Sequence, residues 1–175
     1  ALLELGVQPD ILCCRTEHEL ELNLRRKIAK FCNVSMNAVI EARDASSIYD
    51  VPMLMQAEEL DSVVLDKLGL SKKSTPQLKK WKSFLDRLKN PKTDVDIALI
   101  GKYVELKDSY KSISEAFIHA GVSNEAKVNL HWIHSDNLDK DNVEKELSEM
   151  DGILVAPGCG SRGVAGTIDA VQTAR

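Results

Sequence analysis

The segment 157–166, PGCGSRGVAG, holds the residue types in this sequence that are best suited to chemistry. Glycine stands at positions 158, 160, 163 and 166. Glycine adopts backbone angles that other residues avoid, and it lets a ligand approach the chain closely. Successive N–H groups in such a loop can form an anion-binding nest or the oxyanion hole of an acyl-transfer enzyme. An ordinary turn from a strand into a helix would have the same composition, and the glycines alone do not separate the two.

Cys159 lies within this segment and could be a nucleophile, but the spacing around it argues against that role. A nucleophile elbow has glycines two positions before and two positions after the nucleophile, where this sequence has Pro157 and Ser161. A thiolate also needs a neighbouring base, and the spacing of the four histidines, at 18, 119, 131 and 134, does not indicate a dyad. We therefore expect the loop to act through its backbone.

Other candidate sites are weaker. The segment GKY at 101–103 lacks the remainder of the G-x-x-x-x-G-K-[ST] phosphate loop. In KDSYKS, Tyr110 and Lys111 stand at an expected helix start, where capping by Asp108 or Ser109 is the simpler explanation. The carboxylates are scattered and the histidines lack ligand spacing, so we expect no metal ligands in this chain.

The composition and charge argue against a nucleic-acid-binding protein and a membrane-spanning protein. The chain has 175 residues and a formal net charge of −4, which gives no electrostatic support to nucleic-acid binding. Apolar runs stay well below the roughly 20 residues that cross a bilayer, so no membrane span is expected. The four cysteines form no C-x-x-C pair, and we expect reduced thiols in a cytoplasmic protein.

The first region, which extends to about residue 50, reads as a βαβ unit. An apolar run at 10–14 predicts a strand, 22–32 has helical spacing, and 38–42 predicts a second strand followed by the polar loop RDASS at 43–47. This order predicts a parallel sheet. The basic run RRK at 25–27 is expected on a solvated helix face.

The second region is predicted to be helical. Residues 51–69 read as one helix, with Pro52 near its start and Gly69 as its stop. Thr75 and Pro76 then read as the N-cap and first residue of another helix, whose apolar face recurs at 78, 81, 85 and 88. Many lysines surround that face. We interpret them as the solvated side of a linker helix rather than as an anion-binding surface.

The third region alternates strands with helices and predicts a doubly wound sheet. Strands are expected at 95–101, 127–134 and 152–156, and helices at 108–121, at 141–150 and after the Gly-rich loop. Gly121 is expected to close the first of these helices. Such folds bind ligands at the carboxyl ends of their strands, which is where GKY and PGCGSRG would both lie.

The order of five segments resembles that of the CTP synthase family over the whole chain. These segments are QPDILCCR, RRKIAKFCNV, SSIYDVP, IGKYVELKDSYKSISEAFIHAG and LVAPGCGSRG. The resemblance implies three parts: the end of a P-loop-like synthetase (amidoligase) domain at 1–56, a helical interdomain linker at 57–93, and the start of a flavodoxin-like class I glutaminase domain at 94–175. Family members are much longer. The chain begins without methionine and ends within a helical pattern, so we expect a segment of a longer protein.

The resemblance implies the reaction. Such enzymes use ATP and Mg²⁺ to phosphorylate the 4-oxygen of UTP, and ammonia from glutamine then displaces the phosphate to give CTP, the last step of de novo CTP synthesis. The Cys-His-Glu triad of the glutaminase would lie beyond residue 175, and the magnesium ligands also lie outside this chain, so the chain alone is expected to be inactive. GTP would activate, CTP would inhibit by feedback, and the complete protein would be a homotetramer without a prosthetic group.

The resemblance also assigns residues in the synthetase part. Lys27, in RRKIAKFC, matches a lysine that contacts the phosphates of UTP or CTP, a role that suits a cation of long reach. Arg43, Asp44 and Ala45 match the loop that holds the adenine of ATP, largely through its backbone.

In the glutaminase part, the resemblance implies that Gly158 and Cys159 bind glutamine and form its oxyanion hole. Lys111 and Arg162 would belong to the surface that responds to GTP. The family has phenylalanine where this sequence has Cys159. The loss of that aromatic ring predicts a weaker response to GTP, whereas an oxyanion hole made of backbone groups would persist.

Two other functions remain compatible with the sequence. A non-catalytic, glutaminase-like binding or scaffold protein is suggested by the altered loop at Cys159. Another glutamine-dependent ligase would need a different synthetase half, and the segments RRKIAKFCNV and SSIYDVP argue against it.

Overall fold

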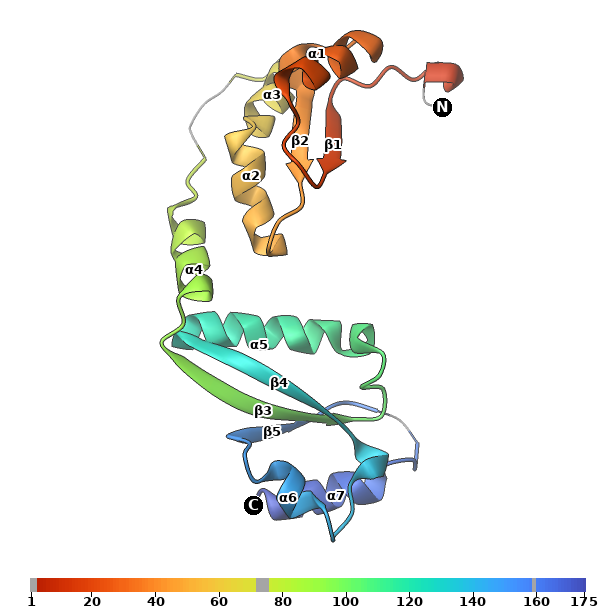
Figure 1. Cartoon of the computed structure of the whole chain (residues 1–175), viewed down its shortest axis with the longest axis vertical. Coiled ribbons are helices and arrows are strands. Elements are labelled where there is room, and N and C mark those ends of the chain that lie inside the picture. The colour runs from red at the N-terminus through yellow and green to blue at the C-terminus, as the bar shows by residue number, and fades with distance from the viewer. Residues whose placement is uncertain (1–2, 72–75, 159) are drawn as a thin grey trace. The chain divides into compact units, whose positions relative to one another are not determined.

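The computed structural model describes residues 3–71, 76–158 and 160–175. Figure 1 shows the chain, which divides into two compact units at residues 1–78 and 79–175. Each unit is described by itself below. The predicted N-cap Thr75 and the predicted glutamine-site residue Cys159 lie outside the described residues. Among the described residues, no helix is long and apolar enough to span a membrane.

The first unit begins with the predicted βαβ arrangement. Its elements are β1 (Leu12–Thr16), α1 (Leu22–Phe31) and β2 (Val39–Arg43). The two strands pair in parallel, with Leu12 opposite Val39. Ala29 of α1 packs with Leu20 and Val39 in a buried cluster, which shows how one face of the helix covers the sheet. The parallel sheet expected from the sequence is therefore confirmed.

The predicted single helix at 51–69 is wrong, because the structure has two helices there, α2 (Val51–Ala57) and α3 (Leu60–Lys67). Between them Glu59 has a left-handed φ of 55°. The break redirects the chain so that Val63 packs against Ala38 and Ile40. A continuous amphipathic pattern does not reveal such a turn. Gly69 lies just after the end of α3 and has a positive φ of 65°. Its predicted role as the end of a helix is therefore confirmed.

The second unit is a three-stranded parallel sheet with helices on both faces. Its elements are α4 (Lys79–Lys89), β3 (Thr93–Gly101), α5 (Lys111–Asn124), β4 (Ala126–His134), α6 (Val143–Leu147), β5 (Gly152–Val155) and α7 (Val164–Thr173). The strand order is β4-β3-β5, so the first strand of the unit lies at the centre. The chain therefore adds one strand on each side of β3, as doubly wound folds do, and the α/β fold class is confirmed.

Alternate residues of β3 face the two helical layers. Leu99 packs with Tyr110 and partly buried Trp132 on the side covered by α5. Ala98 and Ile100 pack on the other side, with residues of α6 and α7. Figure 1 shows α5 on one side of the sheet and α6 and α7 on the other. Because both faces of the central strand are buried, its sequence DIALIG is almost continuously apolar.

Three predicted helix boundaries need correction. α4 begins at Lys79, so Pro76 precedes the helix instead of opening it. α5 starts at Lys111 after a 3-10 turn and has no side-chain cap, so the predicted capping by Asp108 or Ser109 is wrong. Gly121 does not end α5. A Cβ there would overlap the carbonyl oxygen of Ala126, so this glycine permits a close approach between helix and strand.

The basic side of α4 is exposed, as predicted for a solvated face. Lys79, Lys80, Lys82 and Arg87 are all exposed, while Leu85 is buried. On the apolar side, aromatic contacts link α4 to α5. The helix predicted at 141–150 is shorter at both ends in α6. At its start, the Asp139 carboxylate accepts hydrogen bonds from the N–H groups of Asp141 and Asn142, which precede the helix.

Candidate functional site

The candidate site lies at the edge of the second unit's sheet where β3 and β5 end. β3 is paired to β5 through Ile100 opposite Val155, and the N–H of Ala156 then donates to the carbonyl of Ile100 at 2.8 Å. Segments 101–103 and 157–163 therefore leave neighbouring strands side by side. The chain adds strands in opposite directions from β3, so this edge is the topological switch point where such folds bind ligands. The predicted proximity of GKY and PGCGSRG is confirmed.

Lys102 joins the two segments. Its side chain is buried, with only 9% of the residue exposed, and its Nζ donates to the carbonyl oxygen of Gly160 at 2.7 Å. The methylenes of the same side chain lie 3.5 Å and more from the position that a Cβ of Gly158 would occupy. In return, Nη2 of Arg162 donates to the carbonyl oxygen of Lys102 at 3.2 Å. Sequence reasoning missed this link, because a lysine after a strand suggests a phosphate contact and not a backbone contact.

Arg162 also ties the loop to the end of β4. Its Nε lies 3.2 Å from Oδ2 of Asp136. The N–H of Asp136 in turn donates to Nδ1 of His134, the last residue of β4, at 3.2 Å. The Arg162 side chain is nevertheless 62% exposed, so one side of the guanidinium faces solvent.

Two of the loop's glycines serve packing. At Gly163, where φ is 70°, a Cβ would overlap the hydroxyl oxygen of Ser135, and at Gly166 it would overlap the carbonyl oxygens of Ser135 and Leu138. The close approach that these glycines permit is therefore to the protein itself. By contrast, Gly160 has a φ of 88° with open space where its Cβ would be, and Gly158 has room for one. The half of the loop that can face a ligand begins with these two.

Tyr110 fixes the segment that follows β3. It is buried, its hydroxyl oxygen accepts a long hydrogen bond from the N–H of Tyr103 at 3.4 Å, and its ring stacks with that of Trp132. A Cβ on Gly101 would lie 2.6 Å from the Tyr110 hydroxyl oxygen. Position 101 therefore requires glycine, because Tyr110 occupies the space where a Cβ would lie.

Lys111, a predicted GTP-responsive residue, begins α5 and is exposed. Its Nζ lies 2.6 Å from Oε1 of Glu115, one helical turn further on. The hydrogen bond with Glu115 raises the pKa of Lys111. The polar contacts described for Lys111 and for Arg162 are made with different residues and do not join the two predicted GTP residues to each other.

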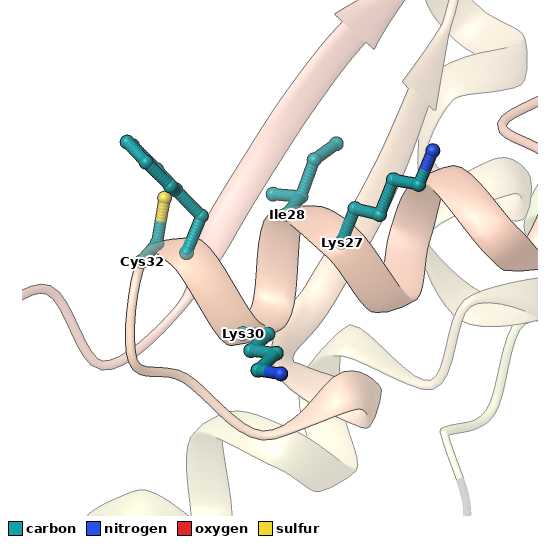
Figure 2. Close-up of a pocket in the computed structure, with 5 residues that line it drawn as sticks. Lys27, Ile28, Lys30 and Cys32 are labelled. Atoms are coloured by element: carbon teal, nitrogen blue, oxygen red, sulfur yellow. The ribbon is translucent and has the colours of Figure 1, made fainter.

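Lys27 lies on α1 beside an open cavity of about 700 Å³. Figure 2 shows this cavity, which is lined by Lys27, Ile28, Lys30, Phe31 and Cys32. Lys27 and Ile28 extend from one side of the helix and Lys30 from the opposite side. Phe31 is 87% exposed and the wall of this cavity is largely apolar, and the cations that line it are Lys27 and Lys30. A long cation above an open concavity is suited to a phosphate group.

Arg43, Asp44 and Ala45, the predicted adenine loop, follow the end of β2. Nε of Arg43 lies 3.6 Å from Oε1 of Glu41. The N–H of Asp44 donates to the carbonyl of Thr16 at 2.9 Å and is thus engaged, and its carboxylate pairs with the Arg15 guanidinium. If this loop binds a base through its backbone, the N–H of Ala45 is the donor to consider.

An ion-pair network that the sequence did not predict lies beneath α1. The Arg25 guanidinium donates to both carboxylate oxygens of Glu58, at 2.7 and 3.2 Å, and lies 3.6 Å from the carboxylate of Glu41. Oε2 of Glu58 also accepts from the N–H of Glu41 at 2.9 Å, and Oε2 of Glu41 from the N–H of Leu20 at 2.7 Å. The prediction of a solvated basic face is wrong for Arg25, whose side chain is only 20% exposed.

This network shifts the pKa values of its members. Burial raises the pKa of Glu58, but hydrogen bonds from Arg25 and from the N–H of Glu41 lower it by more, so the net shift is downward. The hydrogen bond with Glu58 raises the pKa of Arg25. The network joins α1, β2 and the residue that follows α2, Glu58.

In the part of the chain that the structure describes, no three side chains of His, Cys, Asp or Glu lie close enough to hold a metal ion. The family resemblance places the ligands of Mg²⁺ outside this chain, so no step through a metal is assigned to the described residues.

Comparisons with known proteins agree with the two-part organisation. Residues 1–70 match the family described as CTP synthase N-terminus, and residues 105–175 match glutamine amidotransferase class-I. Over 174 residues, the chain is 61% identical to a CTP synthase of Cytophaga hutchinsonii and 59% identical to that of Flavobacterium johnsoniae, covering 99% of this chain and 32% of each relative. A CTP synthase of Methanocaldococcus jannaschii is 49% identical over 180 residues. The chain spans about one third of the length of the curated relatives it matches.

Proposed function

Because this chain belongs to the CTP synthase family, we propose that it is one segment of an enzyme that converts UTP to CTP with ATP and glutamine. One observation carries the proposal. A segment similar to the CTP synthase N-terminus and a segment similar to a class-I glutamine amidotransferase occur in one chain, in that order. A glutaminase joined to a nucleotide-binding unit is the arrangement that glutamine-dependent amination of a nucleotide requires.

The proposed reaction has two halves that balance. ATP transfers its terminal phosphoryl group to the 4-oxygen of UTP, and ammonia then forms the new bond to C4 as inorganic phosphate leaves. The ammonia comes from hydrolysis of the side-chain amide of glutamine. The nucleophile for that hydrolysis would lie beyond residue 175, and the magnesium ligands would also lie elsewhere in the enzyme. The chain alone is then expected to release no ammonia.

The loop at 157–163 would contribute to amide hydrolysis through its backbone. The Lys102 methylenes pack beside Gly158, and Gly160 faces open space where its Cβ would be. N–H groups of this half of the loop, with that of Cys159, would stabilise the oxyanion that develops on the glutamine carbonyl. The loss of one such donor typically lowers kcat by about 100- to 1,000-fold.

Residues of the first unit would bind the nucleotides. Lys27 would contact the phosphates of UTP and of the feedback inhibitor CTP, because it is a cation beside an open cavity. The loop at 43–45 would hold the adenine of ATP. Lys111 and Arg162 would belong to a surface where GTP activates, and the exposure of both side chains supports this assignment. We also propose a cytoplasmic enzyme that works as a homotetramer.

The test is CTP formation by the complete protein, with a matched pair of lysine variants, one in the cavity and one outside it. Lys27→Met should raise KM for UTP roughly 10-fold, as expected when one cation-to-phosphate contact is lost. Lys67→Met makes the same chemical change at an exposed lysine of α3 and should leave KM for UTP within about twofold of wild type. Equal effects of the two substitutions would contradict the assignment of Lys27.

A further inference from the structure

Lys102 is a buried cation that donates a hydrogen bond to the Gly-rich loop. Lysine is almost never buried unless a partner satisfies its ammonium group, and Lys102 is only 9% exposed. Its described partner is a carbonyl oxygen, that of Gly160, at 2.7 Å. A short hydrogen bond from a charged donor is among the stronger hydrogen bonds in proteins. The burial of Lys102 is therefore directed at the backbone of the Gly-rich loop.

The link between Lys102 and the loop is reciprocal. The Lys102 side chain donates to the loop at Gly160, and Arg162 of the loop donates back to the Lys102 carbonyl at 3.2 Å. Arg162 is held from its other side by Asp136, after β4. The loop is consequently fixed at two points, two residues apart, against the ends of the neighbouring strands.

This arrangement determines where the N–H groups of the loop point. In a trans peptide the carbonyl of one residue and the N–H of the next lie in one plane and point in opposite directions. Because the Gly160 carbonyl is turned toward Lys102, the N–H of Ser161 is turned away from Lys102. Gly160 has a positive φ of 88°, and no described atom outside its chain neighbours lies within 4 Å of its Cβ position, so the contact described for this peptide is the one with Lys102.

We infer that Lys102 is a positioning residue for the oxyanion-binding loop, and that its ammonium group holds the Gly160 carbonyl so that the N–H groups of the loop face the substrate side. The inference rests on the proposed function, because it takes the loop to bind the glutamine oxyanion. Lys102 acts through Gly160 and does not touch the substrate. The orientation of such donors before the reaction is what makes an oxyanion hole effective, and a displacement of about 1 Å can lower the rate about 100-fold.

The kinetic test uses the complete enzyme and three substitutions. Lys102→Met keeps the alkyl chain and removes the ammonium group, and Lys102→Arg retains a charged donor. Lys145→Met makes the same change at an exposed lysine of α6. Lys102→Met should lower kcat for glutamine hydrolysis roughly 10- to 100-fold with a much smaller change in KM. Lys102→Arg should recover part of the loss, and Lys145→Met should behave as wild type.

Supplying ammonium chloride in place of glutamine separates this inference from the proposed function. CTP formation from free ammonia bypasses the loop, so Lys102→Met should leave that rate unchanged. Wild-type enzyme that makes no CTP from UTP, ATP and ammonia would refute the proposed function. Normal glutamine hydrolysis by Lys102→Met would refute the role of Lys102 and leave the proposed function intact. A fall in the ammonia-dependent rate as large as the fall in glutamine hydrolysis would also refute that role, because it would indicate a general loss of structure.

A second measurement uses the 175-residue chain and does not depend on catalysis. The ¹⁵N heteronuclear NOE of the backbone amides at residues 160–163 should be lower in Lys102→Met than in wild type or in Lys145→Met, because the loop loses one of its fixed points. Values that are unchanged in the loop would overturn the inference. A loss of the circular dichroism signal would show that Lys102→Met is unfolded. In that case Lys102→Gln, which has a shorter neutral side chain, replaces it in both the kinetic and the backbone measurement, with the same expected results.

Discussion

The Arg25 guanidinium forms two hydrogen bonds with the carboxylate of Glu58, at 2.7 and 3.2 Å, across 33 positions of sequence. Both side chains are about one-fifth exposed, and Glu41 lies against the same guanidinium. Arg25 therefore neutralises two carboxylates that belong to different elements. Its loss would leave both of them without their counter-ion in a partly dry environment.

Arg25→Met should destabilise the first unit by about 1–3 kcal/mol, because charged hydrogen bonds of low exposure contribute in this range. Arg26→Met is the matched control, since Arg26 is exposed on the same helix and bonds only to Asn23 among the contacts described. Urea unfolding of the chain, followed by a probe in the first unit, measures both. Equal midpoints for the two variants would show that the network contributes no stability.

Acid should weaken the first unit through Glu58. The pKa of Glu58 is lowered in the folded state from its ordinary value of 4.5. The unfolded chain therefore binds a proton more readily, and stability is lost as the pH falls below about 4.5 and through the lower folded pKa. Glu58→Gln should be less stable than wild type at pH 7, and the difference should shrink below pH 4.5. A difference that stays constant between pH 7 and pH 3 would contradict the lowered pKa.

Gly166→Ala should destabilise the second unit, which is the reverse of the usual effect. Glycine inside a helix is typically about 0.5–1 kcal/mol less favourable than alanine. Here a Cβ would overlap the backbone carbonyl oxygens of Ser135 and Leu138, which cannot move as a side chain can. The expected loss is about 1–3 kcal/mol, measured as a lower thermal midpoint. A higher midpoint for Gly166→Ala would mean that α7 does not pack this closely on the segment after β4.

Cys159→Phe should increase the activation of the complete enzyme by GTP. This prediction rests on the family resemblance, in which an aromatic ring occupies the position, and Cys159 lies outside the described residues. The measurement is the ratio of glutamine hydrolysis with and without GTP, and the ratio should rise at least several-fold. Cys159→Ala is the control and should leave the ratio near that of wild type. If Cys159→Phe leaves the ratio unchanged, the cysteine is not the cause of a weak response to GTP.

Much of the fold could be predicted because local patterns and tertiary packing agree. The apolar runs at 10–14, 95–101 and 152–156 lie in parallel strands, and the central one, β3, is buried on both faces at its carboxyl end, as its apolar sequence predicts. The proximity of GKY and the Gly-rich loop followed from the same strand order. Helix boundaries were less predictable. The turn at Glu59 follows Glu58, whose ion pair reaches Arg25, 33 positions away, and α5 continues past Gly121 where the helix lies close to Ala126. Neither contact is visible as a local pattern.

The position of the candidate site in the fold could be predicted from the sequence, but its side-chain contacts could not. Its glycines identified the loop, but two of them serve to pack α7 against the segment that contains Ser135. The link from Lys102 to Gly160 joins residues 58 positions apart through a backbone carbonyl, for which no sequence signal exists. The cavity beside Lys27 likewise depends on the exposure of Phe31, which helical spacing alone would have placed in the core.

The most direct test of the central claim follows the nitrogen atom. The complete protein is incubated with UTP, ATP, Mg²⁺ and glutamine labelled with ¹⁵N in the side-chain amide, and the product is examined by mass spectrometry. A CTP synthase will produce CTP that carries ¹⁵N in its 4-amino group, with one ADP and one phosphate formed for each CTP. UTP that remains unconverted with both labelled glutamine and free ammonia would contradict the account and leave a binding or scaffold protein as the better description.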